Sequence, residues 1–458
     1  MLIDDRGVTT SATEPQALAA LEAALAAFQT YCGDPLAPLD EAAAADPGWA
    51  GARIAKALVL MTFFERRFAR EAGEALAAAR PLLHAATPRE RALSHAADLL
   101  VNGEWDAGTA ALDRVLADHP RDVLALQAAH LMDFYRGDAL NLRNRVARVL
   151  PHWSAAVPGY AYVLGMHAFG LEECNQYPEA EAAGRRALDL AADDSWAIHA
   201  VTHVMEMQGR IDEGIAWLEA RREAWAAPGN GFAFHNAWHL ALFHLDRADH
   251  AAAIALYDEW LAGAGGMALS RVDATALLWR LLLEGADPGP RAAAMADAWE
   301  ADLDAEAGFY AFNDFHAALA FAQAGRTQAL ARLMAHVERA AGRQDANGEM
   351  ERRVGLGACR AAIAFGEGRP QDAVAQLMAI RDGASRFGGS HAQRDVLTLT
   401  LVEAATRAGQ PALAAHYVAE RLALRPGNRW GLRLLARARR PGENAARRAA
   451  TPEPLALS

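Results

Sequence analysis

Two pairs of histidines stand four residues apart near the middle of this chain. His199 and His203 form the first pair, with Glu206 three residues later, and His235 and His239 form the second. Residues three and four apart share one face of a helix, so each pair can present two imidazoles on the same side. Imidazoles with a carboxylate are the ligand set of helical zinc and di-metal sites. The spacing is therefore compatible with a divalent-metal site in which Glu206 is a ligand or a general base.

Three interpretations of these histidines stay open. Histidines on inner helices often hydrogen-bond within a packed interior, and the sequence has no HExxH motif that would supply a dedicated base. The same side chains can instead line a pocket for a polar ligand, with Trp238 beside His239 as part of its wall. The third interpretation is the metal site, where a bound ion would make hydroxide available near neutral pH.

A second polar motif, SHAQRD, comes much later and places His391, Arg394 and Asp395 at a predicted helix start. Ser390 is suited to cap that helix. Two glycines precede the motif and would let a ligand approach the backbone. We therefore favour contact of an anion or other ligand by His391 and Arg394 over a plain cap with an Arg394–Asp395 surface pair.

These residues belong to a repeated unit of one helix, a short turn with Gly or Asn, and a second amphipathic helix. The unit reads LVNGEWDAGTAALDRVL from Leu100 and AQAGRTQALARLM from Ala322, and its turns are mostly about 34 to 41 residues apart. Glycine can end the first helix in a left-handed cap. Because one hairpin cannot bury both faces, consecutive hairpins must stack. The repeat predicts an all-α fold, an α-solenoid of tetratricopeptide-like helical hairpins in a right-handed, nearly closed superhelix.

The repeat divides the chain into three predicted parts. Residues 1–14 form an N-terminal lead, and residues 15–438 form a single array of about ten helix pairs. The array is irregular near residues 261–291, where glycines and prolines gather. Residues 439–458 lack apolar periodicity and are predicted to be a disordered tail.

Composition argues against several classes of protein. The formal net charge is -12 and no segment clusters Lys and Arg between aromatic residues, so we expect no nucleic-acid partner. No segment reaches the roughly 20 apolar residues of a membrane span, and the polar start MLIDDRGVTT is unlike a secretory signal. Three cysteines far apart suit a reducing compartment. We therefore expect a cytoplasmic protein without a membrane partner.

Several blocks of the sequence resemble the tetratricopeptide repeat protein 38 family. They are DFYRGDALNLRNRVARVLP, GMHAFGLEE, HAVTHVMEMQGR, FHNAWHLALFHLD, FNDFHAALAF and GGSHAQRDV, and they occur in this order. The resemblance extends from about residue 45 to about residue 430. It implies a helical-repeat fold and brings no family-wide activity with it.

Three functions are compatible with these observations. The first is a helical-repeat binding protein whose concave groove holds a small polar ligand or a peptide segment. Aligned on the turn, His239 and His316 occupy equivalent positions, one residue from that of His199, and can converge in such a groove. The second is a metal-dependent hydrolase or lyase that uses the four histidines of the two pairs. The third is a scaffold for a protein partner, in which these histidines are dispensable.

Overall fold

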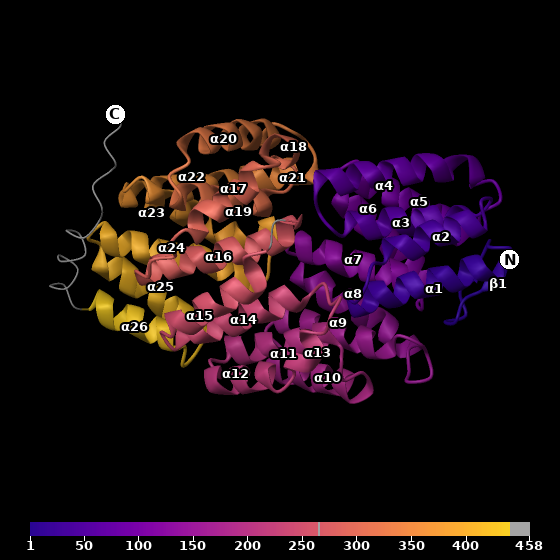
Figure 1. Ribbon diagram of the computed structural model, residues 1–458, viewed down its shortest axis with the longest axis horizontal. Coiled ribbons are helices and arrows are strands. Elements are labelled where there is room, and N and C mark those ends of the chain that lie inside the picture. The colour runs from indigo at the N-terminus through magenta and orange to yellow at the C-terminus, as the bar shows by residue number, and fades with distance from the viewer. Residues whose placement is uncertain (264–265, 440–458) are drawn as a thin grey trace. The chain divides into compact units, whose positions relative to one another are not determined.

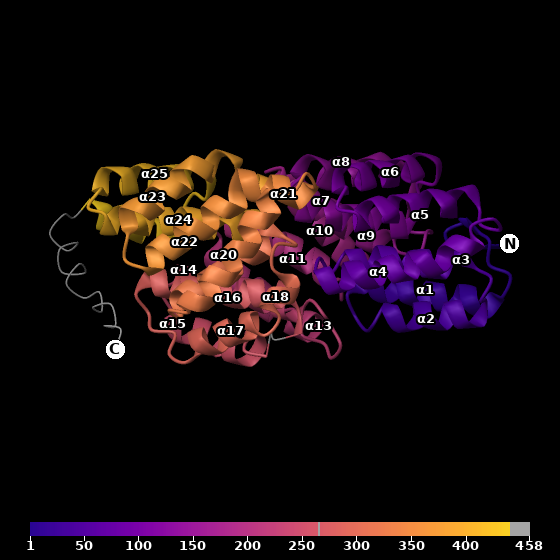
Figure 2. The ribbon, with the colours of Figure 1, turned by 90° about the horizontal axis from the view of Figure 1, so that it is seen from above.

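A computed structural model describes residues 1–263 and 266–439 of the chain (Figures 1 and 2). It confirms an all-α fold, preceded by a two-stranded antiparallel pair, β1 and β2, that the sequence analysis did not predict. The predicted tail lies outside the described residues from residue 440 onward, as do two residues of the glycine-rich run in the irregular segment. Among the described helices, none has the length and apolarity that a membrane crossing requires.

The elements of the first half of the chain are β1 (Leu2–Ile3), β2 (Thr9–Thr10), α1 (Pro15–Thr30), α2 (Leu36–Ala45), α3 (Ala50–Met61), α4 (Arg66–Ala79), α5 (Pro88–Val101), α6 (Trp105–Asp118), α7 (Val123–Tyr135), α8 (Ala139–Val149), α9 (Tyr160–Glu173), α10 (Tyr177–Leu190), α11 (Ser195–Met207), α12 (Ile211–Glu219) and α13 (Arg222–Trp225). Those of the second half are α14 (Ala233–Asp246), α15 (His250–Leu256), α16 (Ala268–Glu284), α17 (Arg291–Glu300), α18 (Leu303–Glu306), α19 (Ala311–Gln323), α20 (Thr327–Ala341), α21 (Ala346–Met350), α22 (Leu356–Gly366), α23 (Pro370–Ile380), α24 (His391–Arg407), α25 (Pro411–Leu424) and α26 (Arg429–Ala438). Short 3₁₀ turns follow α4, α8 and α23, and π-helical turns follow α15 and α21.

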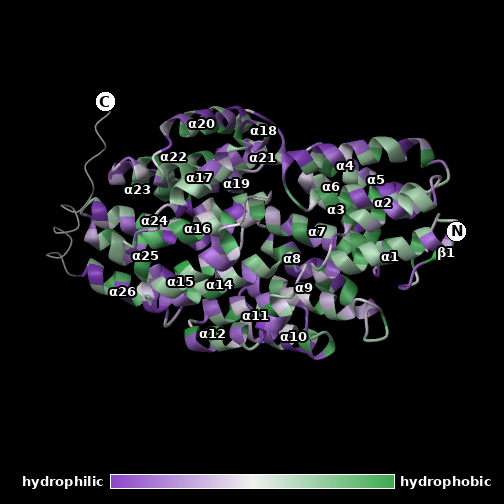
Figure 3. Ribbon diagram, in the orientation of Figure 1, coloured by the Kyte–Doolittle hydropathy of each residue, from purple (hydrophilic) through white to green (hydrophobic). Residues whose placement is uncertain are grey.

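The described residues form two compact units. The first comprises Met1–Val204 and Ala220–Asn236, and the second comprises Met205–Glu219 and the chain from Ala237 onward. Hydrophobic and hydrophilic residues alternate along nearly every helix (Figure 3), as stacked amphipathic hairpins require. One continuous array over residues 15–438 and its right-handed sense stay predictions.

The same tight turn joins the two helices of most hairpins. Its central residue has a positive φ, as the recurring glycine predicted, at Gly103 (80°), Gly137 (65°), Gly209 (69°), Gly325 (66°), Gly368 (72°) and Gly409 (73°). The next residue donates its N–H to the carbonyl five residues earlier, as from Arg326 to Phe321 at 2.9 Å. This left-handed cap satisfies carbonyl groups at the end of the first helix and reverses the chain.

The first helix of most hairpins is buried on nearly all sides, whereas the second buries one stripe. Every residue of α7 except Phe134 is buried. In α20, by contrast, the buried residues recur at helical spacing and include Leu330, Leu333 and Val337. Polar side chains on the first helices therefore have to find partners inside the protein.

The first unit is tied together by contacts between distant segments. The end of α1 meets the segment before α14, where Gly33 N–H donates to Gly229 O at 2.9 Å and Gly231 N–H donates to Tyr31 O at 2.7 Å. The Tyr31 ring stacks on Trp196 with centroids 5.3 Å apart. The first hairpin of this unit thus contacts its last segment.

The second unit is closed in a similar way, by its C-terminal helices. Arg425 donates to the Glu206 carboxylate at 2.7 Å, and Asn428 donates to both Asp246 oxygens at 2.8 and 2.7 Å. Arg433 in α26 donates to the backbone of α14 (Figure 1). The last hairpin therefore packs against helices that precede it by about half of the chain.

We expect the turn position to respond in opposite directions to two matched substitutions. Gly325→Ala adds a methyl group with no atom within 4 Å, so it tests the backbone alone. Ala248 occupies the same turn position with φ of 60°, so Ala248→Gly removes strain. The left-handed region costs a non-glycine residue roughly 1–2 kcal/mol, partly offset by the lower unfolded-state entropy of alanine. Urea unfolding should show a loss of about 0.5–1 kcal/mol for Gly325→Ala and a gain of similar size for Ala248→Gly. Two changes of the same sign would contradict this account of the turn.

Candidate functional site

A buried aspartate fixes the start of the helix that carries the first histidine pair. Asp194 Oδ1 accepts the backbone N–H groups of Trp196 at 3.0 Å and Ala197 at 3.1 Å, at the beginning of α11. Burial raises the pKa of the Asp194 carboxyl to about 7. The cap sets where α11 begins, and His199 and His203 follow on one face of that helix.

Three of the predicted histidines lie together in the first unit. The side chains of His199, His203 and His235 are buried, with exposed fractions of 2%, 0% and 5%. The Nε2 atoms of His199 and His235 are 3.0 Å apart, and the rings of His199 and His203 meet edge to face at 4.4 Å. One ring nitrogen from each histidine lies within 4.8 Å of the others. Two different helices, α11 and α14, thus direct imidazoles at one point.

Two buried carboxylates at the end of α9 adjoin this cluster. Glu172 Oε2 lies 3.4 Å from His203 Nδ1, and both Glu172 and Glu173 offer a carboxylate oxygen within 4.8 Å of a His203 nitrogen. Their exposed fractions are 0% and 4%. Neither residue was among the predicted ligands. The signal in the sequence was weak: two successive glutamates in a helix that is otherwise apolar, GMHAFGLEE.

Aromatic rings surround the histidines of the first unit. The Phe169 ring centroid lies 5.2 Å from that of His199 and 5.4 Å from that of His203, and the Phe232 ring lies 5.1 Å from His199. These rings fill the space around the imidazoles with apolar surface. Electrostatic interactions at the imidazole nitrogens are therefore stronger than they would be in water.

His239 and Glu206 belong to the second unit, where they contact each other. His239 Nδ1 lies 3.0 Å from Glu206 Oε2, while Glu206 Oε1 accepts a hydrogen bond from Arg425. The buried Trp238 ring packs against His239 at 4.8 Å and lies under the Arg280 guanidinium. Both oxygens of the Glu206 carboxylate are thus engaged by residues of the second unit.

His316 also lies in the second unit and is packed among aromatic residues. Its Nδ1 is 2.8 Å from the carbonyl oxygen of Phe312, four residues earlier, and its ring contacts Phe312 and Phe315. Burial lowers the pKa of His316 to about 3. A neutral imidazole bonded to its own helix is typical of a structural histidine.

All three predicted residues of the SHAQRD motif line one pocket in the second unit. The pocket has a volume of about 300 Å³ and lies between α23, α24 and α25, and His391, Arg394 and Asp395 are among its lining residues. Ser390 caps α24 as predicted, because its Oγ accepts the Gln393 N–H at 3.3 Å and the Gln393 side chain accepts the Ser390 N–H at 3.1 Å.

The ion pair of this motif differs from the one considered in the sequence. Asp395 is half-buried and accepts two hydrogen bonds from Arg421, at 2.9 and 2.8 Å, with Arg425 at 3.5 Å. Burial acts to raise the pKa of the Asp395 carboxyl, but the two guanidinium groups outweigh burial and hold it well below its usual range. Arg394 instead donates to the backbone carbonyl of Gly389. Asp395 thus helps to hold the pocket wall together.

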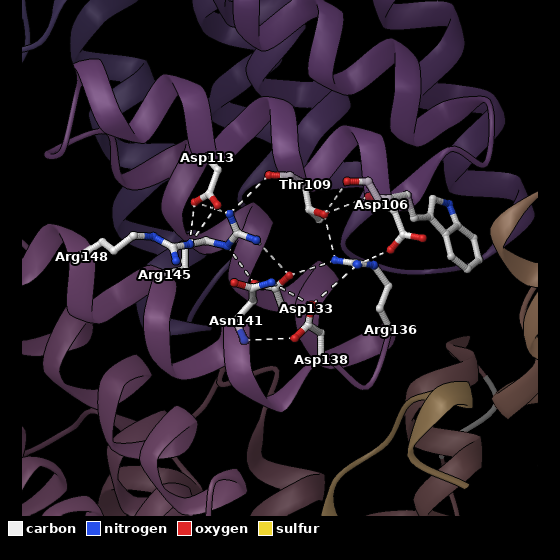
Figure 4. Close-up of polar contacts among 10 residues, drawn as sticks. Asp106, Thr109, Asp113, Asp133, Arg136, Asp138, Asn141, Arg145 and Arg148 are labelled. Carbon is white, nitrogen blue, oxygen red and sulfur yellow. Dashed lines mark hydrogen bonds and ion pairs between the residues drawn. The ribbon is translucent and has the colours of Figure 1, made fainter. Parts of the chain in front are cut away.

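The upstream block DFYRGDALNLRNRVARVLP supplies a buried ion-pair network in the first unit (Figure 4). Asp133 accepts two hydrogen bonds from Arg145, at 2.8 and 3.1 Å, and another from Arg136 at 3.1 Å. Arg145 also contacts Asp113 at 2.6 Å and the backbone oxygen of Thr109. Because each buried charge faces an opposite charge, this network joins α6, α7 and α8 and offers no sign of a ligand site.

Comparison with known proteins finds no family model that matches the chain. Solved structures similar to the chain include a tetratricopeptide repeat protein from Parabacteroides merdae. The two sequences are 11% identical, the match covers 61% of this chain and 99% of that chain, and the TM-score is 0.35. The human IFIT1 dimer with m7Gppp-AAAA has 14% identity, coverage of 87% and 90%, and a TM-score of 0.42. The Cut9–Hcn1 hetero-tetramer has 13% identity, coverage of 92% and 76%, and a TM-score of 0.37. At such low TM-scores these likenesses carry no conclusion of their own.

Removing the ionisation of Asp194 should change how stability depends on pH. Because its folded pKa of about 7 lies above the ordinary 3.8, the stability that this group contributes below the ordinary pKa is lost as the pH rises to about 7. Asp194→Asn keeps an oxygen for both cap bonds and cannot ionise. In urea unfolding, the free energy of unfolding of the variant should rise relative to that of the wild type by up to about 1.4 kcal/mol for each pH unit between about pH 5 and about pH 7. Above about pH 7 the difference between the two proteins should stay constant.

The exposed neighbour Asp193 provides the matched control for this measurement. The charge of Asp193 adds less to the raised pKa of Asp194 than burial does, so Asp193→Asn should change the pH dependence only slightly. A constant difference between Asp194→Asn and the wild type across this pH range would show that Asp194 is already ionised in the folded protein.

Proposed function

We propose that this chain is a helical-repeat binding protein whose second unit holds a small anionic ligand in the pocket beside α24. The observation that carries the proposal is the gathering of four guanidinium groups on one pocket lining. Its side chains include four arginines and a histidine against three carboxylates: Arg381, Arg394, Arg421, Arg425 and His391 against Asp382, Asp395 and Glu420. Arginine is the side chain that most often binds carboxylate and phosphate groups, so an anion is the ligand that we propose for this lining.

The roles of the arginines differ within this pocket. Arg421 and Arg425 contact Asp395, and Arg381 contacts Asp382 and Glu420. Arg394 donates to the backbone carbonyls of Gly388 and Gly389 and lies 3.4 Å from His391 Nδ1. Arg394 stands in the first turn of α24 and on the pocket lining, where the helix dipole adds positive potential, so it is the guanidinium that we propose to contact the anion.

The size of the pocket favours a small molecule over a peptide segment. A volume of about 300 Å³ lies at the lower end of ligand pockets, which run from about 300 to about 1,000 Å³. Apolar side chains of Leu377, Ile380 and Leu401 supply the rest of the lining. A small carboxylic or phosphorylated compound with a short apolar portion fits this combination.

We also infer that the chain is related to the tetratricopeptide repeat protein 38 family. Two observations support this inference: the sequence blocks occur in the order of that family, and two of them supply buried or pocket-lining residues in the structure. One block supplies the Asp133–Arg145 network, and another supplies His391 and Arg394 of the pocket. The relation carries a repeat fold and no activity.

The proposal is tested by anion titration of the purified full chain in a buffer free of phosphate and carboxylates. Inorganic phosphate and succinate serve as separate probes, and the thermal unfolding midpoint is the readout. Binding to the folded state at 100 times the dissociation constant adds about 2.7 kcal/mol of stability. We expect at least one probe to raise the midpoint of the wild type in a saturable manner, and Arg394→Gln to remove most of that rise.

Arg291→Gln is the matched control, because Arg291 lies in the same unit and pairs with Asp258 outside the pocket. This variant should respond to both probes as the wild type does. An equal response of Arg394→Gln and Arg291→Gln, or no saturable response of the wild type to either probe, would rule out an anion site in this pocket.

A further inference from the structure

We propose that the first unit contains a site for a divalent metal ion of the zinc class, held by His199, His203 and His235 and oriented by Glu172. The proposal does not depend on the anion pocket, whose lining residues all belong to the second unit. The observation behind it is the convergence of buried nitrogen and carboxylate ligands from three helices, α9, α11 and α14, on one small region.

The spacing of the nitrogens fits a first coordination shell. Zinc–nitrogen bonds of about 2.0–2.1 Å in tetrahedral geometry place two ligand nitrogens about 3.3 Å apart. The Nε2 atoms of His199 and His235 are 3.0 Å apart. Widening this distance by a few tenths of an ångström would seat the ion, and both histidines present the same ring atom to it.

Glu172 stands where a carboxylate supports a metal-bound histidine. Its Oε2 lies 3.4 Å from His203 Nδ1. In the proposed site the other ring nitrogen of His203, Nε2, is the one that binds the ion. A carboxylate on the far nitrogen fixes the tautomer and orientation of a ligating imidazole and raises its basicity. Glu172 is therefore a positioning residue in this proposal.

The charges of the site also suit a divalent cation. Glu172 and Glu173 are both buried beside His203. A divalent cation bound by neutral imidazoles would interact favourably with both carboxylates. With three protein nitrogens the ion keeps a fourth position, and the aromatic rings around the site restrict access to it.

The test measures metal content rather than activity. The untagged full chain is incubated with excess Zn²⁺, passed through metal-free gel filtration and assayed by elemental analysis. We expect about one zinc per chain in the wild type and nearly none in His199→Gln and His203→Gln. Far-ultraviolet circular dichroism establishes that each variant retains its helices.

His316→Gln is the matched control, because His316 is as buried as His203 and lies in the second unit. It should lose stability and keep its zinc. Glu172→Gln should weaken zinc affinity by about 10–100-fold in competition with a chelating dye, whereas a purely structural role for Glu172 would lower the unfolding midpoint and leave the affinity unchanged.

Substitution of Co²⁺ gives an independent readout, since its visible absorption reports the ligand geometry. The wild type should show the intense bands of a tetrahedral site, and His203→Gln should not. The proposal is overturned if the folded wild type retains no zinc, if the His199→Gln and His203→Gln variants retain as much as the wild type, or if His316→Gln loses zinc to the same extent as they do.

Discussion

Burial of the first helix of most hairpins on nearly all its sides is the constraint on which the rest of this structure depends. A helix that faces solvent can leave its polar side chains to water, but these helices cannot. Asp133 on α7 is fully buried and is held by Arg145 of the next helix. Asp395 on α24 is held by Arg421 in the same way. Acids on inner helices such as these therefore take a partner on the neighbouring helix.

These pairings also explain how each unit is closed. Stacked hairpins alone would form an open array, since each packs only on its neighbours. Here Arg425 reaches Glu206 from the other end of the second unit, and Asn428 reaches Asp246. In the first unit, the end of α1 contacts the segment at Gly229. Polar contacts between distant segments thus convert a local repeat into two compact bodies.

The two candidate sites follow from the same constraint and differ in chemistry. The first unit gathers imidazoles and carboxylates such as His203 and Glu172, which suit a cation. The second gathers guanidinium groups around α24, including Arg394, which suit an anion. The repeat fold has no part in this difference. It supplies inner helices at regular spacing, and the residue types at their buried positions decide what each site can hold.

Local spacing in the sequence was sufficient for the helices, the turns and the histidine pairs. The glycine turns, the Ser390 cap and the i, i+4 placement of His199 and His203 all depend on residues within one or two turns of helix. Which helices face each other depends on how the hairpins stack, and local periodicity does not encode that. Only the tertiary structure therefore placed Glu172 beside His203 and Arg421 beside Asp395, because these partners come from different helices.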